Sequence, residues 1–113
     1  MSSLYLDDKR EPGSNFDIVI RNSVEFKDHI LKNGVPNFIS FDNDLGLDEN
    51  GELYEEGYDC AKWLVDHIMD NDIELPKDFS FYVHSANNIA KEKINNLLNN
   101  FIEHQKKINN NER

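Results

Sequence analysis

Polar side chains that can bind a metal or transfer a proton follow three short apolar runs of the chain. Asp7–Asp8 follows the first run, Asp42-Asn43-Asp44 the second, and His84-Ser85-Ala86-Asn87 the third. Clustered carboxylates repel one another, and a hard divalent cation such as Mg²⁺ or Mn²⁺ relieves that repulsion. Such an ion keeps several waters and also binds a substrate phosphate. The predicted metal ligands are therefore Asp7, Asp8, Asp42 and Asp44.

The group after the third run supplies other chemistry. His84 is the predicted general acid or base, because the pKa of a histidine in water lies near neutrality. Ser85 and Asn87 are predicted to bind non-bridging phosphate oxygens together with the N–H groups that open the next helix. Lys9 and Arg10 directly follow the acidic pair, and we expect them to reach an anionic ligand.

Each of these motifs also has a purely structural interpretation. The acidic pair can form a solvated turn, Asp44 can cap the turn that follows it, and His84 can be a hydrogen-bonded core residue. Either Ser85 or Asn87 is expected to cap a helix, which requires no chemistry. The two basic residues can stay solvated or pair with Glu11. The acidic residues between Asp48 and Glu56 are expected to be solvated, in a loop over residues 46–57 that is long enough for a lid.

Four apolar runs predict the strands that position these groups. They are rich in Val, Ile, Phe and Tyr and do not alternate with polar residues, which indicates strands covered on both faces, as in a parallel sheet. The carboxyl ends of parallel strands meet at one edge, where ligands bind. The four predicted strands are Leu4–Leu6, Phe16–Ile20, Asn37–Phe41 and Phe79–Val83.

Three helical segments complete the pattern. The first starts after Asn22, which has capping-box spacing to Glu25, and ends at Gly34; its apolar stripe is Val24, Phe26, Ile30 and Leu31. The second spans about 57–70, with Tyr58, Ala61, Leu64, Val65, Ile68 and Met69 on one side. The third begins near Ala86–Asn88, carries Ala90, Ile94, Leu97, Leu98 and Phe101, and is expected to fray after Ile102.

The order of elements predicts an α/β domain over residues 1–102 with a polar tail over 103–113. Residues 7–15, between the first two strands, are too few for a crossover helix. We therefore expect the second strand to be parallel to its neighbour and connected by a bare loop.

Composition limits the partners and the compartment. The net charge of −10 and the pI of about 4.7 argue against a broad nucleic-acid surface, though not against a single phosphate ligand beside a metal. No run of about 20 apolar residues predicts a membrane span. A single cysteine, Cys60, which we expect in the core, and the lack of a signal peptide indicate a cytoplasmic protein. The sequence leaves the oligomeric state open, a homo-oligomer included.

Four sequence blocks in the predicted order resemble those of the cyclic-phosphate-processing receiver domains, an offshoot of response-regulator receivers. The blocks are LYLDDKREP, FISFDNDLG, EGYDCAKWL and FYVHSANN, and the resemblance covers residues 4–102. It implies a receiver-like (flavodoxin-like) three-layer fold, reduced to a four-stranded mostly parallel sheet with about three helices. It also implies Mg²⁺ on Asp7, Asp8 and Asp42, with Asp42 at the phospho-accepting position and Ser85 at the small hydroxyl position.

The chain departs from receivers in ways that bear on function. The helix between the first two strands is missing, and so are the fifth strand and its phosphoryl-contacting lysine; Asp44 and His84 are additional. Three functions remain open: metal-dependent hydrolysis of a cyclic phosphate or nucleotide phosphodiester, binding of a phosphorylated small molecule without turnover, and an aspartyl-phosphate switch or interacting receiver relic. The resemblance favours cyclic phosphates or cyclic nucleotides as ligands.

Overall fold

The computed structural model describes residues 2–45, 50–51 and 56–111, with side chains through Lys107. The strands form one sheet in the order β2-β1-β3-β4, and all three neighbouring pairs are parallel. The predicted α/β fold with four strands and three helices is confirmed. The elements are β1 (Ser3–Leu6), β2 (Ile18–Ile20), α1 (Ser23–Asn33), β3 (Phe38–Phe41), α2 (Gly57–Asp70), β4 (Ser80–Val83) and α3 (Asn88–Asn111).

A loop over residues 7–17 connects β1 to β2 without a helix. The two strands pair in parallel with Tyr5 opposite Val19, as the short connection predicted. Both ends of the loop are fixed to the sheet. The N–H of Asp7 donates to the carbonyl of Ile20 at 3.0 Å, and the N–H of Ser3 donates to the Asp17 carboxylate at 2.9 Å.

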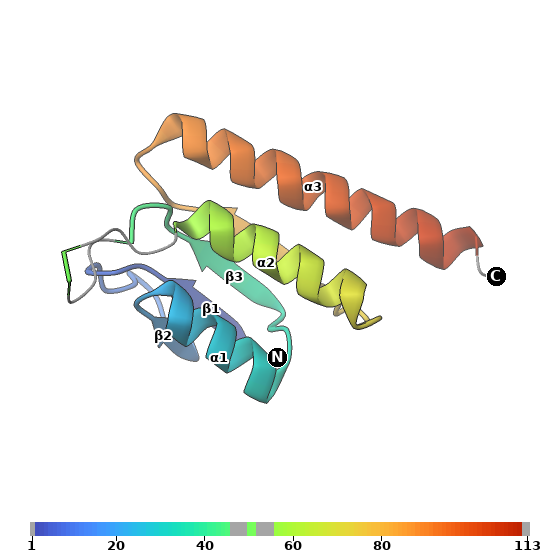
Figure 1. Ribbon diagram of the computed structural model, residues 1–113, viewed down its shortest axis with the longest axis horizontal. Coiled ribbons are helices and arrows are strands. Elements are labelled where there is room, and N and C mark those ends of the chain that lie inside the picture. Colours follow the sequence, from blue (N-terminus) through green and yellow to red (C-terminus); the bar gives the residue numbers. More distant parts are fainter. Residues whose placement is uncertain (1, 46–49, 52–55, 112–113) are drawn as a thin grey trace.

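The three helices pack in one layer against a single face of the sheet (Figure 1). Leu4 and Leu6 of β1 and Ile39 and Phe41 of β3 point into this layer and are fully buried. The described chain therefore has two layers, where the sequence led us to expect three. The helical side chains at the centre of the same core are Phe26, Ile30, Leu64, Ile68, Ile94 and Leu98.

The opposite face of the sheet carries no helix in the described part of the chain. One row across it consists of Val19, Tyr5, Ser40 and Tyr82. Tyr82 is 55% exposed, whereas Tyr5 is buried beneath Phe16, whose ring centroid lies 5.2 Å away. The prediction of cover on both faces was wrong because aromatic and β-branched residues favour strands whether or not a second layer covers them.

Helix ends agree with the sequence more closely than helix faces do. Asn22 caps α1 through its side chain, Gly34 ends it with a φ of 85°, and α2 has its predicted bounds. However, Val24, Leu31 and Met69, all predicted to lie on apolar stripes, are exposed. Val24 and Leu31 lie on α1, whose buried apolar side chains are Phe26 and Ile30, and Met69 is next to the last residue of α2.

The last helix is longer than predicted. α3 continues to Asn111, so the expectation that it frays after Ile102 was wrong. Once a helix has nucleated, each further residue adds a backbone hydrogen bond, and no apolar stripe is needed for it to continue. None of the described helices combines the length with the apolar character that crossing a membrane requires. The loop proposed as a lid, residues 46–57, falls largely outside the described residues.

Candidate functional site

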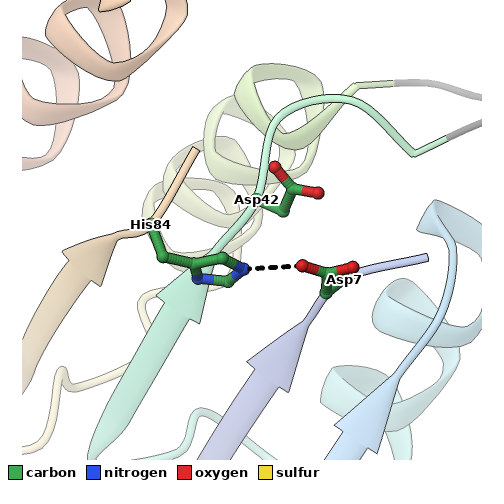
Figure 2. Close-up of side chains that lie close together, drawn as sticks. All are labelled: Asp7, Asp42 and His84. Carbon is green, nitrogen blue, oxygen red and sulfur yellow. Dashed lines mark hydrogen bonds and ion pairs between the residues drawn. The ribbon is translucent and has the colours of Figure 1, made fainter. Parts of the chain in front are cut away.

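Asp7, Asp42 and His84 converge where β1, β3 and β4 end. One potential ligand atom from each lies within 4.8 Å of the other two. Figure 2 shows the imidazole of His84 and the carboxylate of Asp7 facing each other, with the side chain of Asp42 next to them. Parallel strands in register produce this convergence, because each residue follows directly after its strand.

The carboxylate of Asp7 is buried and fully hydrogen bonded. Asp7 is 3% exposed. Its Oδ1 accepts hydrogen bonds from the N–H groups of Lys9 at 2.9 Å and Arg10 at 2.8 Å. Its Oδ2 lies 3.1 Å from Nε2 of His84. Burial alone would raise the pKa of Asp7, but these hydrogen bonds outweigh it and hold the pKa below the ordinary value. The hydrogen bonds of Asp7 therefore favour its ionised form.

His84 is held on both ring nitrogens and on one ring face. Its Nδ1 lies 2.7 Å from the hydroxyl of Ser40, a residue that is 4% exposed. The ring stacks on Tyr5 with centroids 4.6 Å apart and planes 4° from parallel. An ionised carboxylate only accepts hydrogen bonds, so Nε2 carries a hydrogen when it binds Asp7, and Ser40 donates to Nδ1 of the neutral ring.

Asp42 has the opposite electrostatic situation from Asp7. Burial raises its pKa first, and the negative charge of Asp7 raises it further; the N–H of Asn43, bound at 2.9 Å, and His84 only partly offset this. Burial and the charge of Asp7 thus both oppose ionisation of Asp42 beside the ionised Asp7. A divalent cation between them would remove that repulsion, so the donor set fits a hard metal ion.

The start of α2 fixes the position of Asp42. A Cβ added to Gly57 would lie 1.9 Å from the carbonyl oxygen of Asp42, so no side chain fits there. The N–H of Gly57 donates to the carbonyl of Asn43 at 2.8 Å. The buried Asn43 side chain accepts from the N–H of Tyr58 at 3.1 Å and donates to Glu56 at 3.1 Å. The end of β3 and the start of α2 thus form one rigid unit.

The structure places the other predicted acidic ligands outside this group. Asp8 is half-buried, and its charge helps to raise the pKa of Asp42. The chain turns directly after Asp7, because the N–H groups of Lys9 and Arg10 donate to the Oδ1 atom of Asp7, and Asp8 lies within this turn. Asp44 is exposed and accepts from the side chain of Asn43 at 3.3 Å. Metal binding by Asp8 and Asp44 stays a prediction, while His84 takes the third place in the cluster.

Binding of an anionic ligand by the side chains of Lys9 and Arg10 stays a prediction. Lys9 and Arg10 are exposed and contact the site through their backbone N–H groups. Arg21, which sequence reasoning missed, braces the loop: its guanidinium donates to the carbonyls of Asp7 at 3.1 Å and Arg10 at 2.9 Å. The same guanidinium pairs with Glu11, so Glu11 has a partner other than the two predicted.

Ser85 and Asn87 shape the turn into α3. The Asn87 side chain accepts from the N–H of Ala90 at 3.1 Å, so Asn87 is the N-cap. The buried Ser85 hydroxyl accepts from the N–H of Asn87 at 3.1 Å and keeps its own hydrogen for another acceptor. Ser85 follows His84 directly, which places a hydroxyl beside the cluster.

Comparison with known proteins agrees with this geometry. The family described as the cyclic-phosphate processing receiver domain matches residues 2–100. No curated protein and no solved structure matches the chain. The matched stretch includes every strand and all residues of the cluster. The chain therefore belongs to the family of cyclic-phosphate processing receiver domains.

Proposed function

We propose that this domain hydrolyses a cyclic phosphate, with Mg²⁺ or Mn²⁺ bound by Asp7 and Asp42. The observation that carries the proposal is the convergence of these two carboxylates with His84 at the strand ends. Family membership supplies the substrate class, and the raised pKa of Asp42 supplies the electrostatic reason for a cation. When bound, the ion would neutralise phosphoryl oxygens and activate a water.

The proposed reaction adds one water across a P–O bond of the cyclic ester. The water oxygen bonds to phosphorus, the ring oxygen leaves, and a proton is transferred to that leaving oxygen. For this transfer His84 carries a hydrogen on both ring nitrogens and gives the one on Nε2, which faces the carboxylates, and the proton released by the attacking water restores it. Ser40 and Tyr5 keep the ring in place. Ser85 and the first N–H groups of α3 bind non-bridging oxygens. In this proposal Asp8 and Asp44 remain predicted metal ligands, and Lys9 and Arg10 remain predicted contacts of the anionic substrate.

Phosphorelay through Asp42 has less support. In the described part of the chain β4 is the last strand, and the fifth strand with its lysine that receivers use has no counterpart there. Binding without turnover uses the same residues as hydrolysis, so experiment has to separate the two.

The decisive experiment incubates pure protein and Mg²⁺ or Mn²⁺ with 2′,3′-cyclic and 3′,5′-cyclic nucleotides and follows the products by ³¹P NMR. We expect Asp42→Asn to lower kcat more than about a hundredfold, because even changes behind a metal ligand cost about 10–100-fold. The matched control is Asp66→Asn, an exposed aspartate on α2.

Calorimetry on the same proteins measures metal and ligand binding, and it separates hydrolysis from binding without turnover. Metal and ligand binding with the ligand recovered intact would mean a sensor in place of a hydrolase. If wild-type protein binds no divalent ion and cleaves no substrate, the proposal is wrong.

A further inference from the structure

A concavity lies beside the cluster of Asp7, Asp42 and His84, between the starts of α2 and α3. Its volume is about 190 Å³. This is below the roughly 300 Å³ at which pockets for whole drug-sized ligands begin, so it fits one ring system. We call it the ring pocket. The residues that matter for its chemistry are Glu56 and Tyr58 from α2, Asn87, Ile89 and Lys93 from α3 and its cap, and Asn43.

The ring pocket is joined covalently and by hydrogen bonds to the acidic cluster. Asn43, in its wall, directly follows Asp42, and Gly57 packs against the carbonyl of Asp42. On the other side Asn87 lies three residues after His84 and is held by Ser85. Two chain segments, 42–43 and 84–87, therefore link the cluster to the wall of this pocket.

The walls of the pocket suit an uncharged planar ring. Tyr58 supplies an aromatic side and Ile89 an aliphatic one; Ile89 is 73% exposed although it is apolar. Lys93 does not extend freely, because its Nζ lies 5.9 Å from the centroid of the Tyr58 ring. That ammonium group and the side-chain amide of Asn87, of which only the oxygen is used for capping, offer hydrogen-bond donors.

We infer that the ring pocket binds the nucleobase of a single nucleotide whose cyclic phosphate lies at Asp7, Asp42 and His84. This inference rests on the proposed function and narrows its substrate to nucleosides. A base offers a flat apolar surface together with carbonyl and ring-nitrogen acceptors, matching the walls and donors described. A longer nucleic acid fits poorly, because the net charge of −10 repels further phosphates.

The test compares a nucleoside 2′,3′-cyclic phosphate with the corresponding methyl riboside cyclic phosphate, which lacks the base. Affinities come from calorimetry with Mg²⁺ and slowly hydrolysed phosphorothioate analogues, and KM and kcat come from the parent compounds. We expect wild-type protein to bind the base-bearing compound at least about fivefold more tightly, the lower end of what contact between a base and a side chain contributes.

The variant is Ile89→Ala combined with Lys93→Ala; both residues are exposed, so the fold should persist. We expect its affinity for the base-bearing compound to fall at least about fivefold and that for the base-free compound to change less than about twofold. The matched control combines Leu31→Ala with Lys62→Ala, an exposed apolar residue and an exposed lysine elsewhere. It should bind both compounds as the wild type does.

Two outcomes overturn the inference, and they differ in what else they imply. If wild-type protein binds and cleaves both compounds equally well, or the variant weakens both equally, the ring pocket does not bind the base and the proposed hydrolysis stands. If neither compound binds or reacts, the proposed function fails together with the inference.

Discussion

The two faces of the sheet differ in composition and in task. The face under the helices is built of fully buried Leu4, Leu6, Ile39 and Phe41 and supplies the core. The other face alternates aromatic and small polar side chains, and Ser40 on it binds His84. Ser40 is itself buried, and its bond to His84 satisfies the hydroxyl that burial would otherwise penalise. One strand thus contributes to the core on one face and to the site on the other, open face.

The largest expected effect is a loss of unfolding free energy, and it tests whether the face under the helices contributes most of the stability. Phe41→Ala should lower the free energy of unfolding by about 3–5 kcal/mol, because it leaves a cavity in the core. Tyr82→Ala, on the same sheet but 55% exposed, should cost much less. Urea denaturation of both variants measures the difference. Equal losses would mean that the open face is covered in solution.

The next effect concerns the junction between the covered layer and the site. Gly57→Ala should destabilise the domain by about 1–3 kcal/mol or more, because its Cβ would overlap a backbone oxygen that cannot move aside like a side chain. The displaced Asp42 should also weaken Mn²⁺ binding, measured by calorimetry. Gly51→Ala is a poor control because Gly51 has a φ of 80°, so Gly13→Ala, which has open space around it, serves instead. Unchanged metal affinity in a folded Gly57→Ala protein would refute the coupling.

The two carboxylates of the site should respond to pH with opposite signs in metal-free protein. The lowered pKa of Asp7 means that its ionised form stabilises the fold above about pH 4 and that this contribution is lost as the pH falls through the folded-state pKa. The raised pKa of Asp42 means that its ionisation reduces stability as the pH rises from its unfolded-state to its folded-state pKa.

At pH 7 without metal, Asp7→Asn should therefore cost about 1.5–3 kcal/mol, as for hydrogen bonds to a charged group. Asp42→Asn should leave stability equal or higher. Thermal unfolding across pH 3–8 in a chelator measures both. A loss of stability in Asp42→Asn would show that burial and the charge of Asp7 do not penalise this carboxylate.

The smallest effect probes the open face at the site. Ser40→Ala leaves Nδ1 of His84 without its partner and should cost about 1 kcal/mol, with a larger fractional loss in kcat than in KM. Ser40→Thr restores a hydroxyl and should recover kcat in part. Long-range ¹⁵N NMR of the imidazole should show a shifted Nδ1 signal in Ser40→Ala while Nε2 keeps its hydrogen through Asp7; an unchanged Nδ1 signal together with an unchanged kcat would exclude a positioning role for Ser40.

The sequence predicted the elements and the edge of the sheet that carries the site. Asp7, Asp42 and His84 could be found because each follows an apolar run, and parallel strands bring such residues together. The role of Ser40 was harder to predict. It is a single polar residue within the strand FISF, and its position beside His84 follows only once the strand register is known. Arg21 and Gly57 could not be found, because their roles depend on a carbonyl group contributed by a distant segment.

The absence of helices from one face of the sheet, in the described part of the chain, could not be predicted for a related reason. Tyr5, Val19 and Tyr82 are strand-forming residues in either environment, so their identity does not report what lies above them. Likewise the hydrogen bonds of Asp7 to the N–H groups of Lys9 and Arg10 form a local turn that the letters DDKR do not reveal.

Three hydrogen bonds join Asn43, which follows Asp42, to Glu56, Gly57 and Tyr58 at the start of α2. They hold the two ends of the connecting segment together. Because the entropic penalty of a longer loop grows only slowly, residues inserted between positions 46 and 55 should leave Asp42 where these three hydrogen bonds hold it. The position of the carboxylate is thus set by the two ends of the connection and not by its length.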